Sequence, residues 1–401
     1  MVTRLNNRKI NIFYSILQIS YWITSAAVFC FTTVFLQSRG YSNYAIGIVF
    51  AVGNICGFTA QTLVSGYIDR NNKKPLLRCI RITALSAILL MIFVCLLPSG
   101  SLPVIFSYAL IIAGNTLLNP LCISLSLYIE NWGYNISFSH SRALGSFAYA
   151  ICSVVLGILV QRVSENTIPT TLIIFSALIY VSAILFRQED KIYNERRSTS
   201  ENLKAGSENA GNIIVFFKEN KRFLLFLIGT AALYFTHGMI GNFMIEFIRN
   251  IGGTSEDMGN VLAFMTVVEV PVMLFFSRLT KHFKCSSLLR FAAIMFTVKE
   301  FLIYLSQSLP ALYAAETLQA LSFAIFVPAS VKYVGEVIPK RDAVRGQSLV
   351  TSMMTLGSIF ASYFGGLLLD IASPHFTLFV GVIVSAIGTI VMLGAIQTTS
   401  E

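Results

Sequence analysis

The chain has 401 residues, of which 55% are hydrophobic and only 12% are charged. Soluble domains carry roughly 25% charged residues, so this composition excludes an ordinary soluble protein. The formal net charge of +10 could suggest nucleic-acid binding, but the cations gather in short stretches between apolar segments. We therefore predict a multi-pass protein of the cell membrane that contacts lipid and not nucleic acid.

Twelve apolar stretches have the length of about 20 residues that a helix needs to cross a bilayer. They lie at 12–36, 44–68, 76–97, 102–128, 142–161, 169–186, 223–248, 257–277, 287–308, 311–331, 346–369 and 375–396. One long hydrophilic stretch, rich in charged residues, Ser and Asn, separates the first six from the last six. We therefore predict an all-α polytopic membrane protein with two six-helix bundles, 1–187 and 222–401, joined by a cytoplasmic linker, 188–221.

The Lys and Arg residues predict the orientation, because they favour cytoplasmic loops. If both termini are cytoplasmic, 25 of the 29 Lys and Arg lie on that side, and only Arg39, Arg162 and Arg249 lie on the other. Lys299 belongs to neither group because it falls inside an apolar stretch. We therefore predict that both termini are cytoplasmic.

Three charged residues, Lys299, Glu300 and Glu316, fall inside two neighbouring apolar stretches. A charge at bilayer depth is costly, so it usually faces a cavity or a charged partner and marks an ion or substrate path. The alternative is a purely structural set of ion pairs. Lys299 and Glu300 are adjacent, so they project about 100° apart on a helix and cannot both enter one narrow cavity.

A cationic motif, DRNNKKP, begins at Asp69 after the second apolar stretch. A cytoplasmic anchor explains its cations but not Asp69, which could pair with a cation in one conformational state and release it in another. With two halves of six helices, the motif resembles that of the major facilitator superfamily, although Ser65 and Asn72 stand where the family pattern has Gly. We predict conformational gating by the charged residues of this motif. They are Asp69, Arg70, Lys73 and Lys74.

Further stretches are similar to lactose permease and related proton-coupled sugar and nucleoside permeases. They are IGIVFA from Ile46, QTLVSGYID from Gln61, RALG from Arg142 with Tyr149 seven residues later, and EVP from Glu269. In that family, an Arg at the start of helix 5 binds sugar hydroxyls, and an aromatic residue seven positions on stacks on the sugar ring. The resemblance implies that Arg142 and Tyr149 bind substrate. On the residues alone, an end anchor and a packing aromatic remain the alternatives.

The second half departs from that family. In an ungapped comparison, Lys299 stands where the family has an Arg that assists proton coupling, and Ser322 where it has the proton-carrying Glu. His237 and Glu316 fall where lactose permease pairs an Asp with a Lys, so we expect a pair with acid and base exchanged. We expect the remaining charges to take over proton coupling, with Na⁺ as the alternative ion. They are Glu269, Lys299, Glu300, Glu316 and His237.

Other polar and aromatic residues in the first and fourth apolar stretches, among them Tyr21 and Asn119, fit either a sugar or nucleoside site or ordinary packing. The sequence has no G-x-x-x-x-G-K-[ST] motif, so ATP is not the expected energy source, and no catalytic, metal or cofactor constellation is visible. We predict a monomeric secondary transporter, not an enzyme, that binds solute through Arg142, Tyr149, Glu269, Tyr21 and Asn119.

The preferred function is proton symport of a sugar or oligosaccharide by alternating access. The alternatives are a nucleoside symporter, a proton-antiport exporter of an amphipathic compound, and a non-transporting membrane sensor.

Overall fold

The computed structural model of the chain describes residues 6–70, 75–186, 216–218, 220–339 and 342–397. The side chains of Asp69, Arg70 and Val344 also lie outside the description. Lys73 and Lys74 lie outside the described residues, as does most of the predicted linker. The gating role of the cationic motif therefore stays a prediction.

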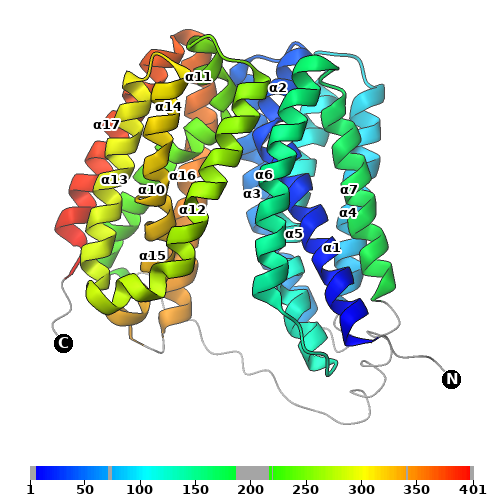
Figure 1. Cartoon of the computed structure of the whole chain (residues 1–401), viewed down its shortest axis with the longest axis horizontal. Helices are drawn as coiled ribbons and strands as arrows, with labels where there is room; N and C mark the ends of the chain where they lie inside the picture. The colour runs from blue at the N-terminus through cyan, green and yellow to red at the C-terminus, as the bar shows by residue number, and fades with distance from the viewer. Residues whose placement is uncertain (1–5, 71–74, 187–215, 219, 340–341, 398–401) are drawn as a thin grey trace. The chain divides into compact units, whose positions relative to one another are not determined.

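The chain folds as two compact units, each built from helices (Figure 1). The first unit comprises Met1–Tyr41 and Val52–Gly206, and the second comprises Ser42–Ala51 and Ser207–Glu401. The residues that the structure describes contain no strand. The all-helical fold predicted from the apolar stretches is therefore confirmed.

In the first unit, α1 packs against α6 and α7, and α4 packs against α5 and α7. The helices of this unit are α1 (Asn7–Ser25), a π-helical turn (Ala26–Cys30), α2 (Thr32–Ser38), α3 (Asn43–Arg70), α4 (Leu76–Leu96), α5 (Leu102–Asn131), α6 (Phe138–Arg162) and α7 (Thr167–Leu185). The first residues of α3 belong to the second unit.

In the second unit, α10 packs against α16 and α17, and α13 packs against α15 and α17. The helices of this unit are α10 (Lys221–Asn242), α11 (Met244–Asn250), α12 (Ser255–His282), α13 (Cys285–Leu305), α14 (Leu309–Glu316), a 3₁₀ turn (Thr317–Ala320), α15 (Phe323–Val337), α16 (Ala343–Ile371) and α17 (Pro374–Ala395).

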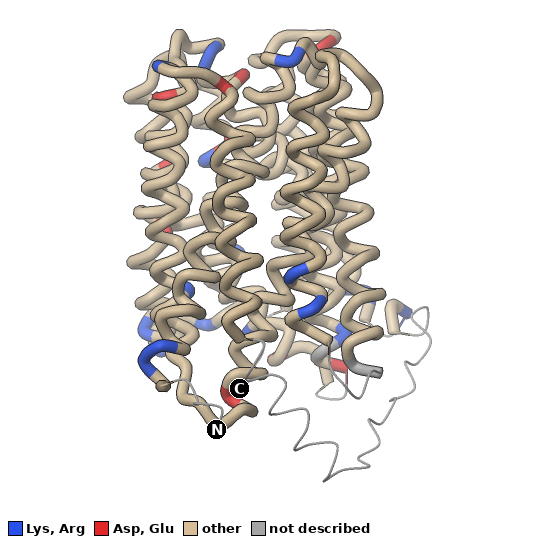
Figure 2. Tube along the Cα trace, turned by 90° about the vertical axis from the view of Figure 1, so that its right-hand side faces the viewer, with Lys and Arg blue, Asp and Glu red and all other residues tan. Residues whose placement is uncertain are grey.

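Eleven helical segments of the described chain are long and apolar enough to cross a membrane. The remaining predicted segment corresponds to α13, which has 21 residues but carries Arg290, Lys299 and Glu300. Few charges lie along the middle of the helices, and most Lys and Arg lie near helix ends (Figure 2). These helices confirm the prediction of a multi-pass membrane protein.

The stretch predicted as one helix at 311–331 is interrupted. After Glu316 the chain continues as a 3₁₀ turn, and Ser322 leaves the helical conformation, with φ −98° and ψ −89°. The Thr317 hydroxyl donates to the carbonyl of Tyr313, and the Ser322 hydroxyl donates to that of Leu318. Such bonds to the carbonyl four residues back favour bending of a helix. The break lies at the position of the predicted coupling charges.

Candidate functional site

A chain of polar side chains runs through the interior of the second unit. The Lys299 ammonium of α13 donates a 2.7 Å hydrogen bond to Oε1 of Gln319, and Nε2 of Gln319 donates a 2.7 Å hydrogen bond to Oε1 of Glu269 on α12. Nζ of Lys299 also lies 3.6 Å from Oε2 of Glu316. Lys299 and Glu316 are fully buried, and Glu269 is half-buried. We call these four residues the buried ionic network.

The break between α14 and α15 brings two members of the network together. Glu316 is the last residue of α14, and Gln319 lies in the 3₁₀ turn that follows. Residues three apart in a 3₁₀ turn lie on one face, so both side chains reach Lys299. In a regular α-helix they would diverge by about 60°. The local backbone therefore sets the geometry of the network.

The Gln319 amide can join an ammonium to a carboxylate, because an ammonium only donates and an ionised carboxylate only accepts. Its carbonyl faces Lys299, and its NH₂ group faces Glu269. With both acids ionised, the network holds one ammonium and two carboxylates. Burying a charge in apolar surroundings is costly unless the charge is paired, so a change in the charge of Glu269 would alter the energy of the network.

His237 does not form the expected pair with Glu316 among the described residues. Its ring instead stacks on Phe323 at 5.1 Å between centroids, and Phe296 lies edge-on at 5.8 Å. Glu316 has Lys299 as its ionic partner. The expectation rested on an ungapped comparison of two positions, and in this chain Lys299 is the cation that reaches Glu316.

Glu300 lies apart from the buried ionic network. It is fully buried and sits beside Ser385 of α17, and neither of its carboxyl oxygens makes a hydrogen bond of normal geometry. Ser385 belongs to a ladder of hydroxyls, in which the Thr297 hydroxyl lies 2.9 Å from that of Ser385 and 2.8 Å from that of Thr389. Lys299 and Glu300 therefore face different neighbours, as their offset around the helix requires.

An aromatic cluster in the first unit surrounds Trp22 of α1. The Arg142 guanidinium of α6 lies over the Trp22 ring, 3.8 Å from its centroid, and the Tyr149 ring meets the indole edge-on at 6.2 Å. The Tyr149 hydroxyl lies 2.7 Å from Sγ of Cys30 in the π-helical turn. Gly145 lies between Arg142 and Tyr149 on the same face, and a Cβ there would collide with the indole. The missing side chain lets Trp22 pack against α6.

This cluster contains a partner that the sequence did not assign, because Trp22 comes from a different helix. A cation over an indole face is worth about 0.5–2 kcal/mol, so Trp22 helps to hold the planar guanidinium in one orientation. The spacing of Arg142, Gly145 and Tyr149 along one helical face was the signal that could have indicated a large aromatic neighbour.

The other two predicted binding residues, Tyr21 and Asn119, differ in their contacts. Tyr21 is buried, and its ring lies 5.3 Å from that of Trp22. Asn119 is half-buried on α5 and takes part in none of the contacts described above. Of the predicted solute-binding residues, Arg142, Tyr149 and Tyr21 thus lie in the aromatic cluster of the first unit. Glu269 lies in the buried ionic network of the second unit.

A family model described as "MFS_1 like family" matches residues 13–380. Among solved structures, the nucleoside transporter NupG has a TM-score of 0.79 at 12% identity, covering 98% of this chain and 100% of its own. A bacterial homologue of the iron transporter ferroportin, in an inward-facing state, has a TM-score of 0.68 at 11% identity, with 98% and 100% covered. At these identities the likeness shows the fold alone.

Two curated relatives extend the comparison. "Uncharacterized transporter YwbF" of Bacillus subtilis is 24% identical over 63% of this chain. "Putative sugar efflux transporter" of Deinococcus radiodurans is 26% identical over 31% of this chain. The chain spans 61% of the length of the first and 32% of the second.

We expect Lys299→Met to lower the free energy of unfolding by about 3–5 kcal/mol, because it leaves the buried Glu316 carboxylate without its cation. Thermal or denaturant-induced unfolding of the purified protein in detergent measures this. The double variant Lys299→Met/Glu316→Gln should recover most of the loss, because neither ion remains. Equal losses in the single and double variants would show that the two residues do not act as an energetic pair.

Proposed function

The chain belongs to the MFS_1 like family of membrane transporters, and on that basis we propose that it carries a small hydroxylated solute together with a proton. It is a multi-pass protein of the cell membrane, as the sequence predicted. Alternating access of two helical units around a solute site is the working principle of such transporters. The observation that carries the proposal is the buried ionic network of Glu269, Lys299, Glu316 and Gln319.

The aromatic cluster supports a solute with both hydroxyl groups and an apolar ring face. A guanidinium presents donors in one plane, and the indole beneath Arg142 keeps that plane fixed. Trp22 and Tyr149 offer ring surface next to these donors. Sugars combine hydroxyl acceptors with C–H faces that pack on aromatic rings. A sugar is therefore the first candidate.

A nucleoside is the second candidate substrate. It contains a ribose with the same hydroxyl chemistry, and its planar base can stack on an aromatic ring. The likeness in fold to the nucleoside transporter NupG favours this candidate. Competition between sugars and nucleosides for binding separates the two.

In the proposed coupling step, a proton binds to the network at Glu269. Glu269 is the one acid of the network that is not fully buried, so it is the acid that solvent or solute can reach. Protonation would remove one negative charge from the network and so change its energy. Gln319 would transmit the loss of charge on Glu269 to Lys299, because the Gln319 NH₂ group would then donate to a neutral carboxyl and no longer to a carboxylate. The occluded state would then be favoured only when solute and proton are both present.

We expect Arg142→Lys to weaken solute binding at least tenfold, because an ammonium keeps the charge but loses the planar donor set that stacks on Trp22. The measurement is the thermal shift of purified protein titrated with sugars and nucleosides, since ligand binding to the folded state raises apparent stability. Arg162→Lys, at the far end of α6, is the matched control and should bind as the wild type does. Equal affinities of Arg142→Lys and the wild type would contradict the assignment of Arg142.

We expect an imposed inward proton gradient to accelerate solute uptake into proteoliposomes and to drive accumulation. In Glu269→Gln, exchange of solute across the membrane should persist, but the gradient should no longer drive accumulation, because the carboxyl that loads the proton is gone. Radiolabelled uptake and counterflow measure the two activities.

Glu300→Gln is the control for this experiment, since Glu300 is a buried acid that forms no hydrogen bond or ion pair with the described residues of the network. It should retain gradient-driven accumulation.

Uptake that ignores the proton gradient in the wild type but follows a Na⁺ gradient would contradict proton coupling. Gradient-driven efflux of hydrophobic cations would instead support proton antiport of an amphipathic compound, and no flux of any solute would support a sensor.

A further inference from the structure

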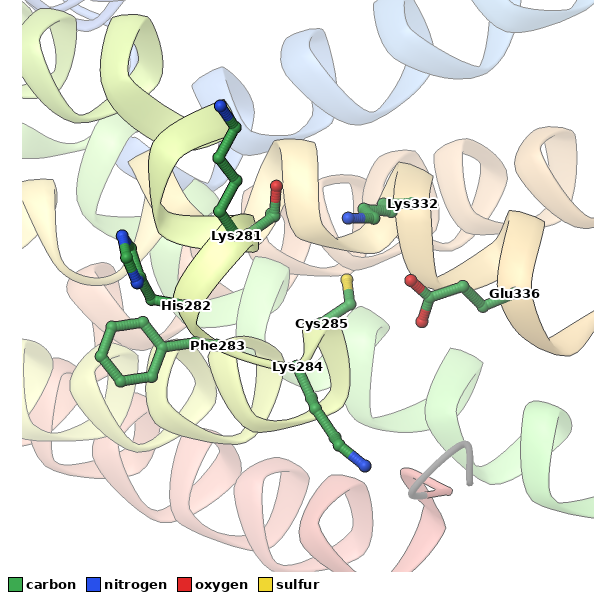
Figure 3. A pocket seen from close by; sticks show the side chains of 8 residues that line it. Lys281, His282, Phe283, Lys284, Cys285, Lys332 and Glu336 are labelled. Atoms are coloured by element: carbon green, nitrogen blue, oxygen red, sulfur yellow. The ribbon is translucent and has the colours of Figure 1, made fainter. Parts of the chain in front are cut away.

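A cavity of about 340 Å³ lies at the end of the second unit, remote from the buried ionic network (Figure 3). It is enclosed by the turn that joins α12 to α13 and by the last two turns of α15. The twelve residues from Glu269 to Lys281 place the two sites about 18 Å apart along α12. The cavity is therefore separate from the proposed coupling site.

The lining of the cavity is strongly basic. Lys281, Lys284 and Lys332 contribute three ammonium groups, and Glu336 contributes the one carboxylate. With His282 neutral, the lining carries two net positive charges. Within the described part of the chain, none of the three ammonium groups forms an ion pair. Among the described residues of this unit, two of the three positive charges therefore remain unbalanced by Glu336.

Two of the four charged side chains that line the cavity are directed toward its centre. Lys332 and Glu336, one turn apart on α15, point toward Cys285, whereas Lys281 and Lys284 extend away from Cys285 in opposite directions (Figure 3). The Cys285 thiol is 3% exposed and donates to the carbonyl of Ala329 at 3.0 Å. Because this thiol is already engaged, the ammonium groups provide the recognition chemistry.

Apolar surface adjoins this basic cavity. Phe283, which lines it and directly follows α12, is 56% exposed, and Leu274 and Phe275 of α12, about two turns earlier, are 71% and 50% exposed. In a membrane protein such side chains face acyl chains, and lysines at the adjacent helix ends lie at the level of the lipid headgroups. A ligand here meets cations at one end and an apolar surface at the other.

We propose that this cavity binds the headgroup of an anionic phospholipid, with its phosphate against Lys332 and the acyl chains along the exposed face of α12. A soluble phosphate compound shares the phosphate chemistry but would leave the apolar surface uncovered. Basic pockets between membrane helices are suited to lipid phosphates, and each nearby cation adds to the attraction. Lys281 and Lys284, beside the α12–α13 turn, would then bind a lipid headgroup in addition to orienting the chain in the membrane.

The test measures lipid binding to the full-length protein by native mass spectrometry and by thermal shift, with phosphatidylglycerol or phosphatidylcholine added to detergent micelles. Phosphatidylglycerol should bind the wild type and raise its melting temperature, and phosphatidylcholine should not. The variant Lys281→Gln/Lys284→Gln/Lys332→Gln should bind phosphatidylglycerol at least tenfold more weakly. Glu336→Gln, which removes the one negative charge of the lining, should bind it more tightly.

The control variant is Lys218→Gln/Lys221→Gln/Arg222→Gln, which removes the same charge from the start of α10 in the same unit. It should bind phosphatidylglycerol as the wild type does. Equal weakening in both triple variants would overturn the proposal, because it would show general attraction between charges. A shift of the same size with inorganic phosphate or glycerol phosphate would overturn the lipid assignment. If the triple variant does not fold, Lys332→Gln alone provides the test, and unchanged binding would overturn the proposal.

Discussion

The interaction on which the second unit depends is the contact between an ammonium and a carboxylate that cannot reach water. Lys299 and Glu316 are both fully buried, and 3.6 Å separates Nζ from Oε2. Removing either partner would leave a charge in apolar surroundings, so each side chain constrains its neighbours. The break after Glu316 places Gln319 where its carbonyl accepts from that ammonium from a second direction.

The aromatic cluster of the first unit uses a different interaction. There the charge of Arg142 lies against an indole face, and the arrangement requires the absence of a side chain at Gly145. In the proposed mechanism, the network provides a carboxyl that loads a proton, whereas the cluster provides the ring surface and the guanidinium donors that bind the solute. Transport with coupling needs both properties, because the solute must be recognised and the ion must alter the stability of a conformation.

The sequence predicted the helices well because an apolar length of about 20 residues is a strong signal for a membrane span. It also predicted that Lys299 and Glu300 would face different neighbours, since adjacent residues diverge around a helix. It did not predict the breaks after Ser25 and Glu316, where no Gly or Pro marks the irregular turn. The expected pairing of His237 with Glu316 failed because Lys299 of α13 is the cation that reaches Glu316. The contact of Trp22 with Arg142 was not predicted because it joins α1 to α6, and sequence spacing within one helix carries no information on contacts between helices.

The central claim is that the Gln319 amide links the proton-loading carboxyl to the buried ammonium. The most direct test is the ratio of protons to solute molecules taken up by proteoliposomes containing Gln319→Leu, compared with the wild type. Leu fills a similar volume but can neither accept from Lys299 nor donate to Glu269. The wild type should take up one proton per solute, and Gln319→Leu should bind solute but move it without a proton. An unchanged ratio in Gln319→Leu would show that the amide does not link Glu269 to Lys299.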